Sequence, residues 1–208
     1  MNKKLELSIF IVIGIIVVTL LGTTFAYFFA RTSNSGNTIT GQTYNFGASI
    51  NSTTIYRATN LVPLKNNLVS TAISKETNKC IDKNNRDVCS LYSVTLSNSG
   101  ETVILTPYIT TTNSTYTTYD LKCQLYNNNF EAVSDIITLP KTTDEKVYIT
   151  NSSNNINISL SSTNQTYYLV VWLTDTLSSQ TEDYSKTYSG TITFEAGNSG
   201  QLYVDFTA

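Results

Sequence analysis

Apolar and polar side chains alternate along several segments of this chain, and this period of two constrains the fold to β-strands more than any other feature does. The segments Ser90–Asn98 and Thr187–Ala196 alternate clearly, with mostly Ser, Thr and Glu on the opposite face, as expected for antiparallel sheets with one face in water. Thr166–Asp175 is apolar on both faces and is predicted to be a central strand of a packed sandwich. The apolar faces of the two alternating segments are Tyr92, Val94 and Leu96, and Tyr188, Ile192, Phe194 and Ala196.

Further β-prone segments are separated by clusters of Asn, Ser and Gly that favour turns. Many Thr, Val and Ile, with 14 Tyr and 8 Phe, supply residue types that suit half-buried strands. We therefore predict an all-β fold, an antiparallel β-sandwich of the jelly-roll kind, as a single domain over residues 31–208. A short helix is also expected at Glu131–Ile137. The further predicted strands are Thr43–Ile50, Thr53–Ala58, Glu101–Thr110, Thr117–Leu125, Lys146–Thr150, Ile156–Leu160 and Leu202–Thr207.

Residues 1–30 have the pattern of an export signal, in which two lysines precede a hydrophobic helix over residues 7–29. Thr24 and Ala26 are the small residues that a signal peptidase reads, so cleavage is expected between Ala26 and Tyr27. Alternatively, the apolar run is long enough to stay in the bilayer as an anchor. In both cases the lysines hold the N-terminus in the cytoplasm, and the β domain is expected to be extracellular, either secreted or at the cell surface.

Cys80 and Cys89 bracket a polar loop in a chain that is expected to be exported, which favours a disulfide between them. Cys123 alternates with Leu121 and Leu125, so a buried thiol is the preferred interpretation, with pairing to Cys80 or Cys89 as the alternative. Three dispersed cysteines without any histidine give no zinc-ligand spacing, and no metal site is predicted.

The loop between the two cysteines contains Asp82, Asn84 and Asp87, which resemble the beginning of a calcium-binding loop. The pattern lacks the glycine at the sixth position and the glutamate at the twelfth that such loops use. A plain disulfide-closed hairpin tip is therefore favoured over a calcium site.

Catalytic patterns are not found in this sequence. Without histidine, Ser-His-Asp and Cys-His catalysis and the histidine-containing metalloprotease motifs are excluded, and no phosphate-binding glycine motif occurs. Glu182 and Asp183 are adjacent and are interpreted as part of a solvated loop. We therefore expect no enzyme, no catalytic residues and no cofactor, and scattered basic residues at a net charge of −2 argue against nucleic-acid binding.

Tyrosines supply the remaining candidate binding groups. Exposed tyrosine rings can stack on sugars, whereas packing in the core and at its rim is the more ordinary role of this residue and is the preferred interpretation. The tyrosines considered for such a platform are Tyr116, Tyr119, Tyr167, Tyr168 and Tyr188.

Four short motifs occur in an order known from one protein family. The junction Leu21-Gly-Thr-Thr-Phe-Ala-Tyr-Phe28 is followed by Asn37-Thr-Ile-Thr-Gly41, by the strand and turn of Ser90–Gly100, and by Gly190-Thr-Ile-Thr-Phe-Glu-Ala196. This order resembles the TasA/camelysin-like surface proteins of Gram-positive bacteria, which are exported through the SipW type of signal peptidase. The segment Leu61-Val-Pro-Leu-Lys65 departs from the family pattern because it lacks the glycine and acid of "L-x-P-G-D".

The resemblance implies a jelly-roll domain that self-associates into fibres of the biofilm matrix. In TasA-like assembly, the polar segment freed by cleavage, about Tyr27 to Thr40 here, adds as a strand to the next subunit, with Phe28 and Ile39 as anchoring side chains. Some family members are called metalloproteases, a label that a chain without histidine does not support. The competing expectation is a membrane-anchored adhesin or carbohydrate-binding module.

Overall fold

The structure is a computed structural model, and it describes residues 39–40, 47–74, 77–118, 120–177, 180, 183, 185–197 and 200–208. By its contacts the chain divides into two units, Met1–Ser33 and Asn34–Ala208. The expected signal or anchor helix, the cleavage residues Thr24, Ala26 and Tyr27, and the proposed anchor Phe28 lie outside the described residues. Within the described ranges, no helix is long and apolar enough to cross a membrane.

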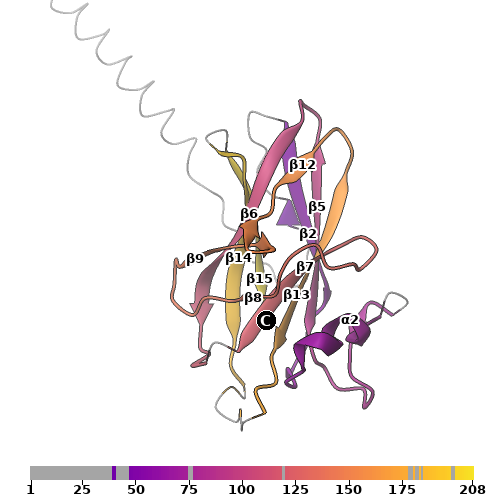
Figure 1. Cartoon of the computed structure of the whole chain (residues 1–208), viewed down its shortest axis with the longest axis vertical. Coiled ribbons are helices and arrows are strands. Elements are labelled where there is room, and N and C mark those ends of the chain that lie inside the picture. Colours follow the sequence, from indigo (N-terminus) through magenta and orange to yellow (C-terminus); the bar gives the residue numbers. More distant parts are fainter. Residues whose placement is uncertain are drawn as a thin grey trace, which may run out of the picture. The chain divides into compact units, whose positions relative to one another are not determined.

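Strands of the first sheet run antiparallel in the order β1-β2-β5-β13-β7-β8 (Figure 1). Strand β13 is central, as predicted, because it pairs with β5 on one side and with β7 on the other. The strands are β1 (Ile39–Thr40), β2 (Ala48–Tyr56), β5 (Ser90–Asn98), β7 (Leu121–Asn127), β8 (Ile137–Thr138) and β13 (Gln165–Leu173).

Strands of the second sheet follow the order β12-β6-β14-β15, and β9 pairs with β6 beside β12. The chain passes repeatedly between the two sheets. Strands β5 and β7 belong to the first sheet and β6, between them in sequence, belongs to the second, and β13 of the first sheet is followed by β14 of the second. This confirms an antiparallel, sandwich-like all-β fold. The strands are β6 (Val103–Ser114), β9 (Lys146–Tyr148), β12 (Ile158–Leu160), β14 (Tyr188–Glu195) and β15 (Gln201–Thr207).

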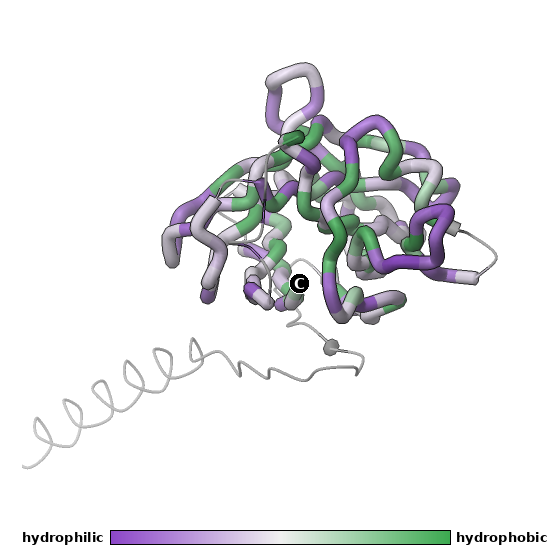
Figure 2. Tube along the Cα trace, turned by 90° about the horizontal axis from the view of Figure 1, so that it is seen from below, coloured by the Kyte–Doolittle hydropathy of each residue, from purple (hydrophilic) through white to green (hydrophobic). Residues whose placement is uncertain are grey.

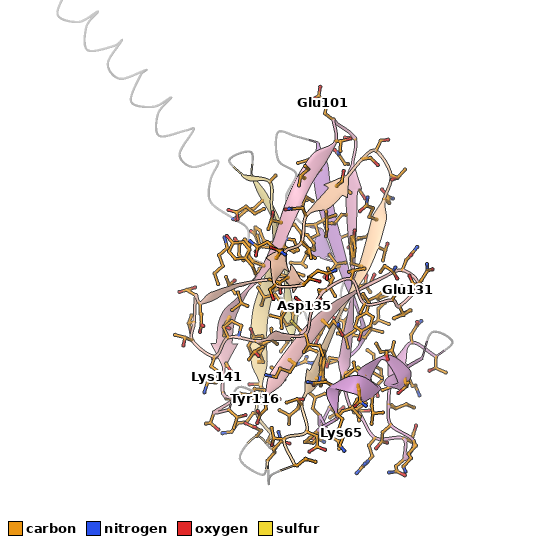
Figure 3. The ribbon with its side chains drawn as sticks, viewed as in Figure 1. Lys65, Glu101, Tyr116, Glu131, Asp135 and Lys141 are labelled. Atoms are coloured by element: carbon orange, nitrogen blue, oxygen red, sulfur yellow. A yellow bond between two sulfur atoms is a disulfide. The ribbon has the colours of Figure 1, made fainter. Side chains whose placement is uncertain are left out.

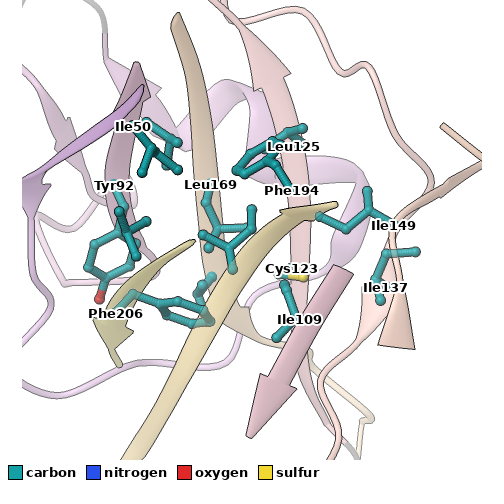
Figure 4. Packing of buried hydrophobic residues seen from close by; sticks show 14 of the residues in the cluster. Ile50, Tyr92, Ile109, Cys123, Leu125, Ile137, Ile149, Leu169, Phe194 and Phe206 are labelled. Carbon is teal, nitrogen blue, oxygen red and sulfur yellow. The ribbon is translucent and has the colours of Figure 1, made fainter. Parts of the chain in front are cut away.

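The main core lies between the two sheets. Ile50, Tyr92 and Leu169 come from the first sheet, and Phe194 and Phe206 come from the second (Figure 4). The predicted apolar faces of β5 and β14 both point into this core, and the alternation appears in Figure 2 as green and purple stretches that follow each other along the trace. Periodicity of two therefore identified the correct side of both strands.

A second apolar cluster covers the opposite face of the first sheet. Val170 and Trp172 of β13 point into it, whereas Leu169 and Val171 point into the main core. The long apolar run of β13 is explained by this burial on both faces. The covering segment, residues 57–89, contains η1 (Asn66–Leu68), α2 (Val69–Ala72), β3 (Ile73–Ser74) and β4 (Lys79–Cys80).

The predicted helix at Glu131–Ile137 is wrong. The side-chain oxygen of Asn127 accepts hydrogen bonds from the backbone N–H groups of Asn129 and Glu131, which forms a tight turn. The chain then runs back along β7, where Val133 N–H donates to the Leu125 carbonyl at 2.9 Å. Backbone N–H and C=O groups that would bond within a helix bond to the neighbouring strand instead.

Two further expectations are corrected by the structure. The segments Thr43–Ile50 and Thr53–Ala58 were expected as separate strands, but Ala48–Tyr56 is one continuous strand because polar Asn51 and Ser52 pair with β5 without a break. On β14, Thr191 and Thr193 were expected in water but are buried, 7% and 4% exposed. The hydroxyl of Thr191 donates to Asp205 on the neighbouring strand β15.

Candidate functional site

Cys80 and Cys89 form the predicted disulfide, with Cα atoms 5.3 Å apart. Both residues are fully buried in the second apolar cluster, so the bond fastens the covering segment to the beginning of β5. Cys123 is a buried free thiol in the main core, as expected, and pairing with the other cysteines is excluded by their own bond. Burial raises the pKa of the Cys123 thiol far above its usual range.

The loop that this disulfide closes is a hydrogen-bonded hairpin tip. The Asp82 carboxylate accepts from the backbone N–H groups of Asn84 and Arg86, at 2.8 and 2.9 Å, and forms an ion pair with the Arg86 guanidinium. The hydrogen bond from the Arg86 side chain is the main reason why the pKa of Asp82 is lowered. The carboxylate that a calcium site would need is therefore occupied by the turn itself.

The short helical segment formed by η1 and α2 is held in place by hydrogen bonds to β13 and the residues that follow it. Oδ1 of Asn66 accepts hydrogen bonds from Trp172 Nε1, at 3.0 Å, and from the Thr174 hydroxyl. The backbone of Leu64 bonds to the strand end, through its N–H to the Leu173 carbonyl and through its carbonyl to the Asp175 N–H. These contacts join residues that are more than a hundred positions apart in the chain.

Between the helical segment and the hairpin tip lies a groove of about 710 Å³, which we call the α2 groove. Its volume falls within the range of small-ligand sites. The lining includes the apolar side chains of Pro63, Leu64, Leu68, Ala72 and Ile81, and the charged residues Lys65, Asp82, Lys83, Arg86 and Asp175.

A second groove, of about 420 Å³, lies beside β12 and the beginning of β13, and we call it the amide groove. Its lining carries no charged side chain among the described residues. Tyr167 donates from its hydroxyl to Gln165 at 2.9 Å, and Gln165 donates to the Ser159 carbonyl at 2.8 Å. The polar lining consists of Asn151, Asn155, Asn157, Ser159, Gln165 and Tyr167.

The tyrosines considered as a sugar platform are not brought together. Tyr116 and Tyr188 are buried, 8% and 2% exposed, so neither offers a ring face to a ligand. Tyr168 stacks on Phe130, with ring centroids 4.3 Å apart, on the side of the second cluster. Tyr167 lines the amide groove, while Tyr119 lies outside the described residues.

Asp183 corrects another expectation. It was expected in a solvated loop, but it is only 5% exposed, and the Thr118 hydroxyl donates to its Oδ2 at 2.6 Å. Its other oxygen, Oδ1, has no hydrogen-bond partner. Burial, together with the nearby Asp183 carboxylate, raises the pKa of Tyr116 to about 12. Glu182 lies outside the described residues, and no group of three metal-ligating side chains occurs in the part of the chain that is described.

Two of the strands at the edges of the described sheets are β1 and β15. In the first sheet, β1 pairs with β2 through Ile39 opposite Ser52 and Thr40 opposite Asn51. In the second sheet, the described strand order ends at β15, so its outer edge pairs with no described strand. Tyr188 and Ala208 exchange both backbone hydrogen bonds. In this register the backbone N–H and C=O groups of the even-numbered residues of β15 point toward β14, and those of the odd-numbered residues point away from it.

No protein-family model and no curated protein matches this chain. The solved structures that resemble it in part include two enzymes. One is AvmM, which catalyses macrocyclization in alchivemycin A biosynthesis; at 9% identity the match covers 57% of this chain and 79% of that one, with a TM-score of 0.31. The other is a cupin-superfamily sugar phosphate isomerase from Silicibacter pomeroyi, at 8% identity over 85% of this chain and 92% of that one, with a TM-score of 0.20. Similarities this low carry no argument about function.

Proposed function

We propose that this protein is an exported structural surface protein, a jelly-roll subunit of extracellular biofilm-matrix fibres that assemble by strand addition. The observation that carries the proposal is the outer edge of β15, at which the described order of the second sheet ends. An edge strand presents backbone donors and acceptors to an extended segment that aligns with it. On β15 the Thr207 carbonyl already accepts a hydrogen bond from the Tyr92 hydroxyl, so the contact would use the outward backbone groups of Asp205. Main-chain hydrogen bonds give such a contact affinity, and alternating side-chain pockets set its register.

The strand that adds is the segment of about Tyr27 to Thr40, with Phe28 and Ile39 as anchors. Its last two residues, Ile39 and Thr40, pair with β2 of their own chain. Cleavage after Ala26 would free this segment from the apolar residues 7–26. One contact of this kind repeated head to tail gives an open filament rather than a closed ring.

Deletion of Phe28–Thr38 from the secreted form tests the donor segment. We expect the monomer to stay folded and the filaments to disappear from electron micrographs. Fibres that persist after the deletion would overturn the proposal. N-terminal sequencing of surface-exposed protein tests the export step, because a start at Tyr27 supports secretion and assembly, whereas a retained Met1 supports the anchored alternative.

Substitution of Asp205 tests the acceptor edge. Asp205 is an odd-numbered residue of β15, so its N–H points away from β14. Asp205→Pro removes this N–H and the side chain, whereas the control Asp205→Ala removes the side chain alone, including its bond to Thr191. We expect filaments from the alanine variant and none from the proline variant. Equal assembly of both variants would exclude this edge as the acceptor.

A second candidate function, a membrane-anchored adhesin or carbohydrate-binding module, is favoured by the amide groove. Amide and hydroxyl groups beside the Tyr167 ring offer hydrogen bonds and a stacking surface without any charge, which suits a neutral sugar. The test is titration with neutral hexasaccharides of glucose, mannose and N-acetylglucosamine. Binding that is lost in Tyr167→Ala and kept in Tyr168→Ala would support this function, and no binding at millimolar sugar would exclude it.

A further inference from the structure

The α2 groove combines apolar side chains with two exposed lysines. Leu68 is 43% exposed and lines the groove together with Leu64 and Ala72, so a large hydrophobic side chain faces solvent there. Lys65 and Lys83 line the same groove and are exposed, and neither forms an ion pair with any described residue. Figure 3 shows Lys65 beside α2. Apolar surface and uncompensated positive charge thus meet within one site.

Both walls of the α2 groove are built independently of any ligand. One wall is fixed by the bond from Trp172 to Asn66, and the other is fixed by the Cys80–Cys89 disulfide and the hydrogen bonds within its loop. Walls that are already ordered lose little conformational entropy when a ligand binds. The α2 groove is therefore a preformed site.

The charges of the groove favour an anion. Asp82 and Arg86 neutralise each other in an ion pair of 2.6 Å. The other charged residues of the lining are Lys65, Lys83 and Asp175, and the Asp175 carboxylate already accepts a hydrogen bond from the Leu177 N–H at 2.9 Å. This positive excess stands out in a chain whose net charge is −2.

We propose that the α2 groove binds a single-chain amphiphile with an anionic head group, of the fatty-acid type. The hydrocarbon chain lies over Leu64, Leu68 and Ala72, where it loses contact with water. The carboxylate lies between Lys65 and Lys83, whose flexible stems let their ammonium groups reach it. This binding function is separate from fibre assembly, because it uses neither the β15 edge nor the N-terminal segment.

Titration with dodecanoate, kept below its micelle concentration, tests the proposal on the exported domain. We expect saturable binding by calorimetry, with NMR shifts concentrated at Leu64, Leu68 and Ala72. Dodecyltrimethylammonium has a similar hydrocarbon chain and the opposite charge, and it should bind at least tenfold more weakly. Equal affinity for the two amphiphiles would overturn the assignment of the lysines, and shifts elsewhere in the domain would overturn the site.

Variants separate the head-group contact from the chain contact. Lys65→Gln combined with Lys83→Gln should weaken dodecanoate binding roughly three- to tenfold, because each exposed ion pair contributes little by itself. Lys186→Gln, a lysine outside the groove, is the matched control and should leave the affinity unchanged. Thr71→Trp fills the groove from an exposed position of α2 and should abolish binding while the domain stays folded.

A membrane surface is the other source of anionic amphiphiles, and the same variants distinguish it. A groove that takes one chain binds monomeric dodecanoate, and Thr71→Trp removes that binding. Binding to vesicles of anionic phospholipid that survives in Thr71→Trp, without binding of monomeric dodecanoate, would overturn the proposal in favour of surface attachment. We expect Thr71→Trp to form filaments as the wild type does, so that a loss of amphiphile binding is distinguishable from a failure of assembly.

Discussion

The indole Nε1 of Trp172 donates a 3.0 Å hydrogen bond to Oδ1 of Asn66, and this bond joins the centre of the first sheet to the segment that covers it. The Trp172 ring is fully buried between that sheet and α2. A buried N–H needs a partner, and the partner here comes from a segment far away in the sequence. The bond therefore stabilises both the fold and one wall of the α2 groove.

Removal of this acceptor should destabilise the domain. In Asn66→Ala the Trp172 N–H loses its partner inside the protein, and we expect the free energy of unfolding to fall by about 1–3 kcal/mol. Asn67→Ala is the matched control, because Asn67 is exposed next to it. Urea denaturation followed by tryptophan fluorescence measures both variants. Equal unfolding midpoints would show that the bond contributes nothing.

The disulfide should stabilise the domain because it lowers the conformational entropy of the unfolded chain. Cys80 and Cys89 are 9 positions apart, and on the chain-entropy model a loop of this size stabilises the folded state by about 2–3 kcal/mol. The double variant Cys80→Ala and Cys89→Ala should lose this amount in urea denaturation. Reduced wild-type protein is the internal control and should unfold near the same urea concentration as the variant. A variant as stable as the oxidised protein would contradict the prediction.

The sheet strands could be predicted from sequence because each carries its own local pattern. Tyr92, Val94 and Leu96 alternate within β5, and the burial that they predict is the burial found. The covering segment had no such pattern, since η1 and α2 are too short to show a helical period. Its position depends on Leu64 pairing with the end of β13, a long-range contact that no local spacing reveals.

The candidate sites were only partly predictable for the same reason. Two cysteines that bracket a polar loop predicted the disulfide, and the loop forms one wall of the α2 groove. The lysines of that groove are separated in sequence and come together only because the covering segment folds back on itself. The burial of Asp183 and the position of Tyr167 in the amide groove depend likewise on tertiary packing, which residue spacing alone does not encode.

Gly190 should tolerate no side chain. It lies at the irregularity in the pairing of β14 with β6, and a Cβ atom there would come within 2.8 Å of the Tyr188 ring and 3.1 Å of the Phe206 ring. Overpacking of this kind costs about 1–3 kcal/mol, so we expect Gly190→Ala to unfold at a clearly lower temperature. Ser189→Ala adds no atom at the neighbouring position and is the control. Calorimetry that finds the same melting temperature for both variants would refute the predicted clash.

Asp135 should make the stability of the domain depend on pH at the acid end. Its carboxylate accepts hydrogen bonds from the backbone N–H groups of Ser153 and Ser152, at 3.0 and 3.1 Å, and from the Thr150 hydroxyl. These bonds hold together the two-residue turn between β10 (Thr150–Asn151) and β11 (Asn154–Asn155), in which both serines have positive φ. The bonds, above all that from Ser153, lower the pKa of Asp135 below its ordinary value of 3.8.

A carboxyl group with a lowered pKa in the folded state binds its proton less readily there than in the unfolded chain. The stability that Asp135 contributes is therefore fully present above the unfolded pKa, near 3.8, and is lost as the pH falls through the folded pKa. Asp135→Asn cannot titrate, so the stability difference between wild type and variant should be largest near neutral pH and shrink below about pH 4. Glu101→Gln, at the loop tip between β5 and β6, is the control and should follow the wild-type curve (Figure 3). Urea denaturation at a series of pH values measures this difference, and a constant gap from neutral to acid pH would show that the turn does not depend on the Asp135 charge.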